Sequence, residues 1–251
     1  MSFCLGIKVR DGLIGIADTR LISGTERSTA RKVTIHQYGH HSLFLMTSGL
    51  RSVRDKALTY FEEMMLEEEH SFDKLYKAVN AFGEQVRRVA REDKQALEES
   101  GLEFNLFSLI GGQLEKDGEH RLYMLYPQAN WVEISVGTPY YIIGETGYGK
   151  PLLDRALRYD TDMETALKIG YLAFDATRTS ATDVDFPLDI VLYREGSYTM
   201  VETRFEREDI VETADWWQAQ MVRLASEAPA SWTDQLIKKA NPASQVLPTP
   251  R

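Results

Sequence analysis

The residues with the most evident chemistry lie at the start of the chain. A serine follows the initiator methionine, so removal of Met1 would leave Ser2 with a free α-amine beside its hydroxyl. A serine hydroxyl needs an adjacent base to act as a nucleophile. An α-amine has a pKa of about 7.7–8.0, low enough to accept that proton at neutral pH. Ser2 would therefore carry nucleophile and base in one residue.

A predicted hairpin brings charged residues back toward Ser2. Residues 3–9 alternate between apolar and other positions, Asp11-Gly12 is typical of a two-residue turn, and residues 13–17 form the return strand. The return strand leads to Asp18 and Arg20, and Lys32 follows. A buried lysine held by an aspartate would lower the pKa of the hydroxyl and keep the amine neutral.

The expected register raises a geometric condition. With Arg10 opposite Leu13, Ser2 lies opposite Leu21, and Asp18 points to the other face of the sheet. A bulge, or the end of strand pairing, is needed to aim the Asp18 carboxylate correctly.

This N-terminal pattern resembles the proteasome β-type threonine peptidases. The residues that carry the resemblance are the N-terminal hydroxyl residue, Ala17-Asp18-Thr19-Arg20 and Lys32-Val33. Two downstream regions are similar to Anbu, the bacterial proteasome-like branch: Gly144-Glu145-Thr146-Gly147-Tyr148-Gly149-Lys150-Pro151, and Phe174-Asp175 to Phe186-Pro187-Leu188-Asp189. The resemblance extends over roughly residues 2–205.

The resemblance implies roles for further residues. The backbone N–H of Gly49 would hold the oxyanion, although the spacing alone is also that of a plain strand-to-helix turn. Arg20 would support the Lys32–Asp18 pair, Asp175 would orient the N-terminal residue, and Ser180 would add a nearby hydroxyl. Where proteasomes have a Gly-Ser-Gly loop beside the nucleophile, this chain has Gly144-Glu145-Thr146. Either Glu145 or Thr146 would supply the auxiliary polar contact, and we favour Thr146.

Other motifs point to weaker hypotheses. Gly144-x4-Gly149-Lys150 has the spacing of a phosphate-binding loop, but Pro151 stands where a serine or threonine should hold magnesium. His36, His40 and His41 surround a predicted turn without an acidic or cysteine partner at ligand spacing, so we expect structural or surface roles. Cys4 lies inside the first strand and is expected to be a buried core thiol. No cofactor or metal is expected.

The elements follow one another as strands, two helices, strands, two helices and strands. This order predicts an α+β fold, a four-layer αββα sandwich, as the resemblance also implies. The expected helices cover residues 52–69, a stretch beginning at an N-cap Ser71, a stretch near 150, and one from a Thr161/Glu164 capping box through 173. The expected later strands cover residues 33–38, 42–47, 105–111, 121–126, 131–136, 140–143, 188–193 and 197–202.

The last 46 positions are expected to be separate from this catalytic domain. We predict a domain over residues 1–205, and a helical extension over 206–251 whose end, from Asn241, is mobile. Trp216 and Trp217 in this extension fit a subunit contact and a helix docked on its own domain equally well.

Whole-chain properties exclude several classes. The 251 residues carry a net charge of −9, which disfavours nucleic acid or an anionic membrane as the main partner. A single cysteine excludes an internal disulfide framework. No apolar run approaches the length of a membrane span, and the start lacks a signal-peptide pattern. We expect a cytoplasmic globular protein.

Three functions fit these observations. The first is a self-compartmentalising peptidase that acts on peptide or protein substrates in a large homo-oligomeric ring or spiral, with an ATP-dependent partner left open. The second is an amidase acting on a small or isopeptide amide, and the third is a catalytically silent scaffold in which Met1 is retained. Ser2 lacks the methyl group of threonine, which restricts the rotamer, so lower or altered activity than in a Ser2→Thr variant is expected.

Overall fold

The structure is a computed structural model, and it describes residues 2–23, 26–67 and 72–240. The chain separates into two compact units, Met1–Ile210 and Val211–Arg251. Within the described residues, the first unit contains two five-stranded sheets, a two-stranded sheet and four covering helices. The second consists of most of α5 (Arg207–Glu227) and all of α6 (Ser231–Ala240).

Two five-stranded antiparallel sheets form the centre of the first unit. One sheet has the order β10-β1-β2-β11-β12 and the other the order β5-β6-β7-β8-β9. The first comprises β10 (Tyr140–Gly144), β1 (Phe3–Val9), β2 (Gly12–Asp18), β11 (Leu188–Arg194) and β12 (Met200–Phe205). The second comprises β5 (Val33–Tyr38), β6 (His41–Gly49), β7 (Leu106–Gln113), β8 (Arg121–Leu125) and β9 (Trp131–Glu133).

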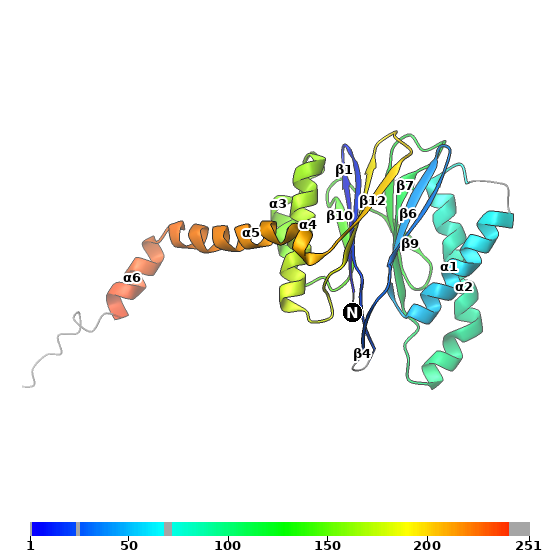
Figure 1. Ribbon diagram of the computed structural model, residues 1–251, viewed down its shortest axis with the longest axis horizontal. Helices are drawn as coiled ribbons and strands as arrows, with labels where there is room; N and C mark the ends of the chain where they lie inside the picture. The colour runs from blue at the N-terminus through cyan, green and yellow to red at the C-terminus, as the bar shows by residue number, and fades with distance from the viewer. Residues whose placement is uncertain (1, 24–25, 68–71, 241–251) are drawn as a thin grey trace, which may run out of the picture. The chain divides into compact units, whose positions relative to one another are not determined.

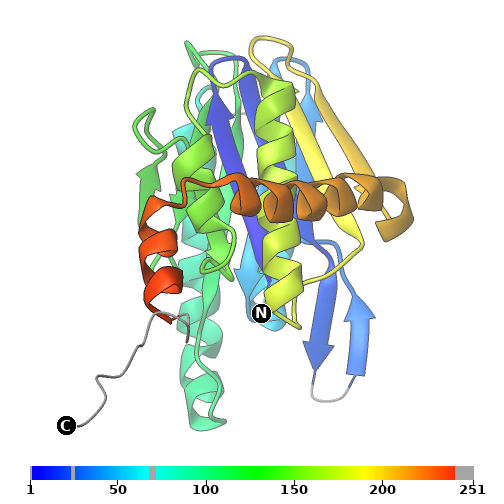
Figure 2. The ribbon, with the colours of Figure 1, turned by 90° about the vertical axis from the view of Figure 1, so that its left-hand side faces the viewer.

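Two pairs of helices cover the outer faces of the sheets. Helices α1 (Arg51–Glu67) and α2 (Leu75–Glu99) cover the second sheet, and α3 (Lys150–Ala156) and α4 (Met163–Ser180) cover the first (Figures 1 and 2). The four layers confirm the predicted αββα sandwich. The central strands β1 and β2 are covered on both faces, so they are buried along their whole length.

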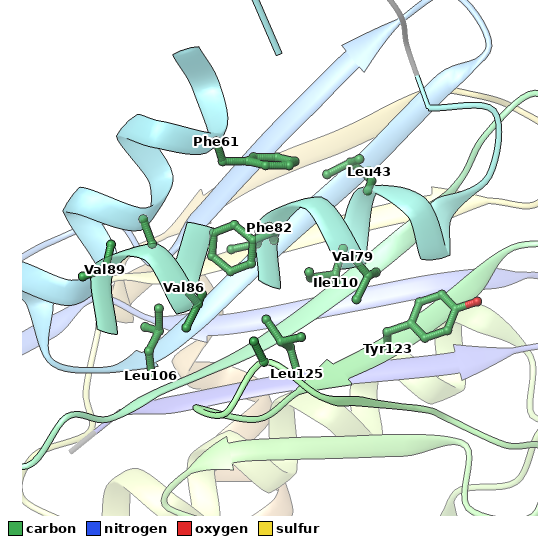
Figure 3. Packing of buried hydrophobic residues seen from close by; sticks show 14 of the residues in the cluster. Leu43, Phe61, Val79, Phe82, Val86, Val89, Leu106, Ile110, Tyr123 and Leu125 are labelled. Carbon is green, nitrogen blue, oxygen red and sulfur yellow. The ribbon is translucent and has the colours of Figure 1, made fainter. Parts of the chain in front are cut away.

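Apolar side chains fill the spaces between these layers. Under α1 and α2, the rings of Phe61 and Phe82 meet edge to face, with centroids 5.5 Å apart, and pack over Leu43 and Leu125 (Figure 3). A second cluster between the sheets includes Cys4, Ala17, Phe44, Met46 and Leu122. This close packing fixes the two sheets against each other, and therefore fixes the strand ends where the candidate site lies.

The predicted register of the first hairpin was wrong by two residues. Cys4 pairs with Ala17 and Val9 with Gly12, so Arg10 and Asp11 form the turn. The reason is burial: Arg10 and Asp11 are exposed, whereas Gly12 is buried against β11. Ser2 therefore lies beyond the pairing of β1 with β2, whose last pair is Cys4 with Ala17.

Other element boundaries also differ from the prediction. A small hairpin of β3 (Arg20–Ser23) and β4 (Glu26–Thr29) was not predicted. The N-cap of α4 is Asp162, whose carboxylate accepts from Thr165 N at 2.9 Å, whereas Thr161 accepts from Arg158 N. Strand β12 begins at Met200, because Ser197 forms a turn with Arg194 and Thr199.

Three expectations concern residues outside the described ranges. They are the removal of Met1, the N-cap role of Ser71 and the mobility of the chain end from Asn241.

Candidate active site

Ser2 lies next to a buried ion pair. Asp18, at the end of β2, accepts a hydrogen bond from Lys32 Nζ at 2.6 Å and another from the backbone N–H of Phe3 at 2.7 Å, both at its Oδ1 atom. The Phe3 amide donates to this carboxylate where the β1–β2 ladder ends. From the sequence, we expected Asp18 to reach the start of the chain only at a bulge or where strand pairing ends. The structure has the second arrangement.

Lys32 is fixed by two acceptors. Besides Asp18, its Nζ atom donates to the backbone carbonyl of Arg20 at 2.9 Å, and the Lys32 side chain is only 2% exposed. The Arg20 guanidinium points elsewhere: it pairs with Asp185 at 2.8 Å and donates to Thr182 O at 2.9 Å. Arg20 thus contributes its backbone to the Lys32 ammonium, and its side chain ties β3 to the loop before β11.

Neighbouring groups compensate the cost of burying the Asp18 carboxylate. Burial raises the pKa of Asp18 above its usual range, and the Lys32 ammonium and the Phe3 N–H counteract that rise. Its Oδ2 atom has no hydrogen-bond partner among the residues that the structure describes. The pair therefore holds its geometry only as long as Lys32 provides the compensating charge.

The segment after β10 holds Ser2 from the other side. Glu145 N donates to Ser2 O at 2.7 Å, and Phe3 pairs with Gly144. A Cβ atom on Gly144, whose φ is +93°, would lie 1.9 Å from Ser2 O. Only glycine permits this approach, so the Gly144-Glu145 backbone is the part of the loop that contacts Ser2.

Gly49 ends β6 at the junction with α1. Its φ is +142°, and a Cβ atom there would lie 2.2 Å from the carbonyl oxygen of Asn105 on the neighbouring chain segment. Gly49 is exposed, and Leu50 N bonds to the same Asn105 oxygen. A side chain is thus excluded at Gly49 for a steric reason, which is consistent with both the oxyanion role and the plain turn.

Asp175 lies inside α4, which extends beyond the predicted helix end at residue 173. The helix continues to Ser180, and the Arg178 guanidinium approaches Asp175 Oδ1 to 2.5 Å. This ion pair one turn apart explains how the acidic side chain is tolerated near the helix C-terminus. The ring of the preceding residue, Phe174, packs against the ring of Phe3, with centroids 5.9 Å apart. Helix α4 therefore contacts the residue that follows Ser2. Ser180 is exposed on the last turn.

Thr146 is exposed beside a surface cavity. It lines an open cavity of about 270 Å³ together with Tyr140, Ile142 and Lys150. Lys150 Nζ donates to Asp154 at 2.7 Å and lies 3.3 Å from the Tyr140 hydroxyl. The lysine of the phosphate-loop pattern is therefore engaged in an ion pair on its own helix.

The remaining candidate residues contact protein groups. Cys4 is fully buried, its Sγ donates to Thr47 O at 3.6 Å, and burial raises the pKa of its thiol to about 12, as expected for a core thiol. His36 packs edge-on against Phe61, and His40 stacks on Tyr198. Within the described ranges, no group of three or more His, Cys, Asp or Glu side chains is arranged to hold a metal ion.

Sequence reasoning missed one residue at this site, Ser48. Its hydroxyl lies 3.1 Å from the position that a Gly144 Cβ atom would occupy, the same position that lies 1.9 Å from Ser2 O. The alternation of β6 was the only signal in the sequence, since it places Ser48 on the same face as Phe44 and Met46.

The comparisons with known proteins identify the family and the fold. The family model described as proteasome subunit matches residues 2–186. Anbu from Yersinia bercovieri is 28% identical with a TM-score of 0.83, and the match covers 90% of this chain and 97% of that one. The chain in the structure of the helical assembly of the Anbu complex from Pseudomonas aeruginosa is 27% identical with a TM-score of 0.84. This match also covers 90% of this chain and 97% of that one. The comparison with curated proteins found no match.

A third Anbu structure, a Gly-1 mutant from Hyphomicrobium sp. strain MC1, is 26% identical with a TM-score of 0.82, and the match covers 91% of this chain and 98% of that one. Among the helices that the structure describes, none is long and apolar enough to cross a membrane. The family match spans most of the first unit and the Anbu structures share its fold, so the chain belongs to the proteasome family and the Anbu resemblance is confirmed.

Proposed function

We propose that this chain is an N-terminal nucleophile hydrolase that cleaves peptide bonds with Ser2 after removal of Met1. The observation that carries the proposal is the buried contact of Lys32 with Asp18 and of Asp18 with the Phe3 amide, directly beside Ser2. A buried ion pair is costly to maintain and stabilises a fold poorly. Its placement at the residue with the N-terminal hydroxyl favours a catalytic role over a structural one.

The proposed reaction uses the two functional groups of Ser2. The α-amine takes the hydroxyl proton while Ser2 Oγ forms a bond to the carbonyl carbon of the substrate. The resulting oxyanion is stabilised by the Gly49 N–H. The C–N bond then breaks as the leaving amine receives the proton from the ammonium. A water molecule, deprotonated by the same α-amine, hydrolyses the ester and restores Ser2.

The neighbouring charges have defined parts in this proposal. In this proposal the Lys32 ammonium, linked to the start of β1 through Asp18, favours the negative charge that develops on Ser2 Oγ. Asp18 and the Arg20 carbonyl hold that ammonium in place. Arg20 and Asp175 act through the loop before β11 and through α4, respectively.

We further propose that the active form is a homo-oligomer that encloses its sites and takes peptide or protein substrates. Support comes from the Pseudomonas aeruginosa relative, which forms a helical assembly. Whether the subunits close into a ring or continue as a spiral determines how a substrate enters.

Intact mass, followed by reaction with a β-lactone or epoxyketone probe, tests the proposal. We expect the purified chain to lack Met1 and to gain one probe per subunit, and the Ser2→Ala variant to gain none. A chain that retains Met1 and takes up no probe would overturn the proposal, because an acylated Ser2 nitrogen cannot act as the base. That result would favour the scaffold function.

A further inference from the structure

Proteasomes place the serine of a Gly-Ser-Gly loop beside the nucleophile, and the corresponding loop of this chain has no serine. The two residues that could replace it are occupied elsewhere. The Glu145 carboxylate accepts from Gly147 N within its own loop at 3.3 Å. Thr146 is exposed and lines the cavity beside Tyr140 and Lys150. Neither side chain has a hydrogen bond to Ser2 among the described residues, so a hydroxyl from another element is the alternative.

Ser48 on β6 meets this requirement. Residues of β6 alternate between the two core clusters: Leu43 and Leu45 lie under α1 and α2, whereas Phe44 and Met46 lie between the sheets. Ser48 continues the second set, so its hydroxyl points from the second sheet toward the first. It is partly accessible, in contrast to the buried side chains that precede it on the strand.

The point where Ser48 meets the first sheet is Gly144. A Cβ atom placed on Gly144 would lie 1.9 Å from the Ser2 carbonyl oxygen and 3.1 Å from the Ser48 Oγ atom. Ser48 is also adjacent in sequence to Gly49, which carries the proposed oxyanion N–H. The Ser48 hydroxyl thus lies close to the Gly144 backbone that contacts the Ser2 carbonyl, and it is next in sequence to the proposed oxyanion glycine.

We propose that Ser48 is a positioning residue of the hydrolase site, whose hydroxyl orients the processed Ser2 in place of the missing loop serine. The inference rests on the proposed function. An N-terminal residue has free rotations about its backbone and side-chain bonds, and its amine must be aimed at its own hydroxyl. A hydroxyl that reaches it from the opposite sheet restricts those rotations, and the tightly packed core fixes that hydroxyl in turn.

The test measures the covalent reaction of full-length protein with a β-lactone probe by intact mass over time, which separates the inactivation rate constant kinact from the probe affinity KI. For Ser48→Ala we expect kinact to fall roughly 10- to 100-fold with KI nearly unchanged, the effect of a misaligned reacting group. Ser48→Thr keeps the hydroxyl on the same carbon, and we expect it to restore most of the rate.

A control variant and two competing variants separate this role from a general disturbance. Thr47→Ala alters the neighbouring residue, whose side chain points to the other face of β6, and we expect it to keep kinact within about twofold of the unsubstituted protein. Glu145→Gln and Thr146→Ala alter the two alternative loop residues, and under this proposal each lowers kinact less than Ser48→Ala does. A melting temperature close to that of the unsubstituted protein would show that Ser48→Ala is folded.

The outcomes distinguish this inference from the proposed function. Ser48→Ala reacting at the unsubstituted rate, or Thr146→Ala losing the rate instead, would overturn the role of Ser48 and leave Ser2 as the nucleophile. A Ser48→Thr variant that folds but does not recover would also overturn it. Absence of any reaction in the unsubstituted protein would overturn both.

Discussion

At the residue scale, the Lys32–Asp18 ion pair is expected to matter most for stability. Both side chains are almost fully removed from water, with exposed fractions of 2% and 0%. Two charges in such a place are stable only together. Removing one leaves the other buried without compensation, which costs much more than breaking an exposed pair.

We therefore expect Lys32→Met to lower the free energy of unfolding by about 3–5 kcal/mol near pH 8. The loss should be smaller at lower pH. Without Lys32, the raised pKa of Asp18 rises further, so the folded state holds a proton that the unfolded state releases. Stability of the variant then falls as pH rises from the ordinary carboxyl pKa through that of the folded state. Urea unfolding at pH 5 and pH 8 measures this difference.

Lys168→Met is the matched control. Lys168 pairs with Glu164 at 2.6 Å, but both side chains are mostly exposed. We expect no measurable change in unfolding at either pH, as is usual for surface pairs. Equal effects of the two substitutions would contradict the importance of burial at Lys32.

Cys4 gives a second prediction at this scale. Burial raises the pKa of its thiol to about 12, so the group stays protonated and inaccessible at pH 8. We expect the native protein to remain unlabelled by Ellman's reagent, and the guanidinium-unfolded protein to react with one equivalent, since the chain has one cysteine. Rapid labelling of the native protein would show that the first strand opens.

At the element scale, the start of α4 discriminates between two capping arrangements. The sequence favoured a Thr161/Glu164 box, whereas the structure has Asp162 accepting from Thr165 N. We expect Asp162→Ala to lower the melting temperature by a few degrees through loss of the cap. Glu164→Ala keeps that bond, removes the side chain that a capping box needs, and should change the melting temperature less. Thermal unfolding followed by circular dichroism compares the two variants, and a larger loss in Glu164→Ala would favour the capping box.

The order and type of the elements were predictable, because each depends on local pattern. The period of the apolar residues identified α1, α2 and the strands of both sheets, and turn residues separated them. The hairpin register was not predictable in the same way. Asp11-Gly12 is a strong local turn signal, but burial of Gly12 against β11, which is far along the chain, moved the turn to Arg10 and Asp11.

The candidate site was predictable to the extent that it resembles a known pattern. The spacing of Ser2, Asp18 and Lys32 led to the contacts that the structure contains. The position of Ser48 could not be derived, because its approach to Gly144 depends on how the two sheets face each other. The role of Thr146 as the auxiliary group stays a prediction.

At the scale of the whole molecule, the sandwich brings distant segments to one end of the paired sheets. Ser2 precedes β1, Asp18 ends β2, Lys32 precedes β5, Ser48 and Gly49 end β6, and Gly144 ends β10. No single element could provide this set. The tightly packed interior between the sheets is what holds these strand ends in register with one another.

The second unit exposes an apolar face that bears on the proposed homo-oligomer. On α6, Trp232, Leu236 and Ile237 are spaced four and one residues apart, on one side of the helix, and are 66%, 57% and 67% exposed. Contiguous apolar surface of this kind usually marks a contact with another protein surface. We expect the triple variant Trp232→Ser, Leu236→Ser and Ile237→Ser to shift the mass measured by light scattering toward the 28.6 kDa of one chain. Lys238→Ser with Lys239→Ser, on the same helix, should leave the mass unchanged. An assembly that keeps its full mass in the triple variant would show that subunits associate through the first unit alone.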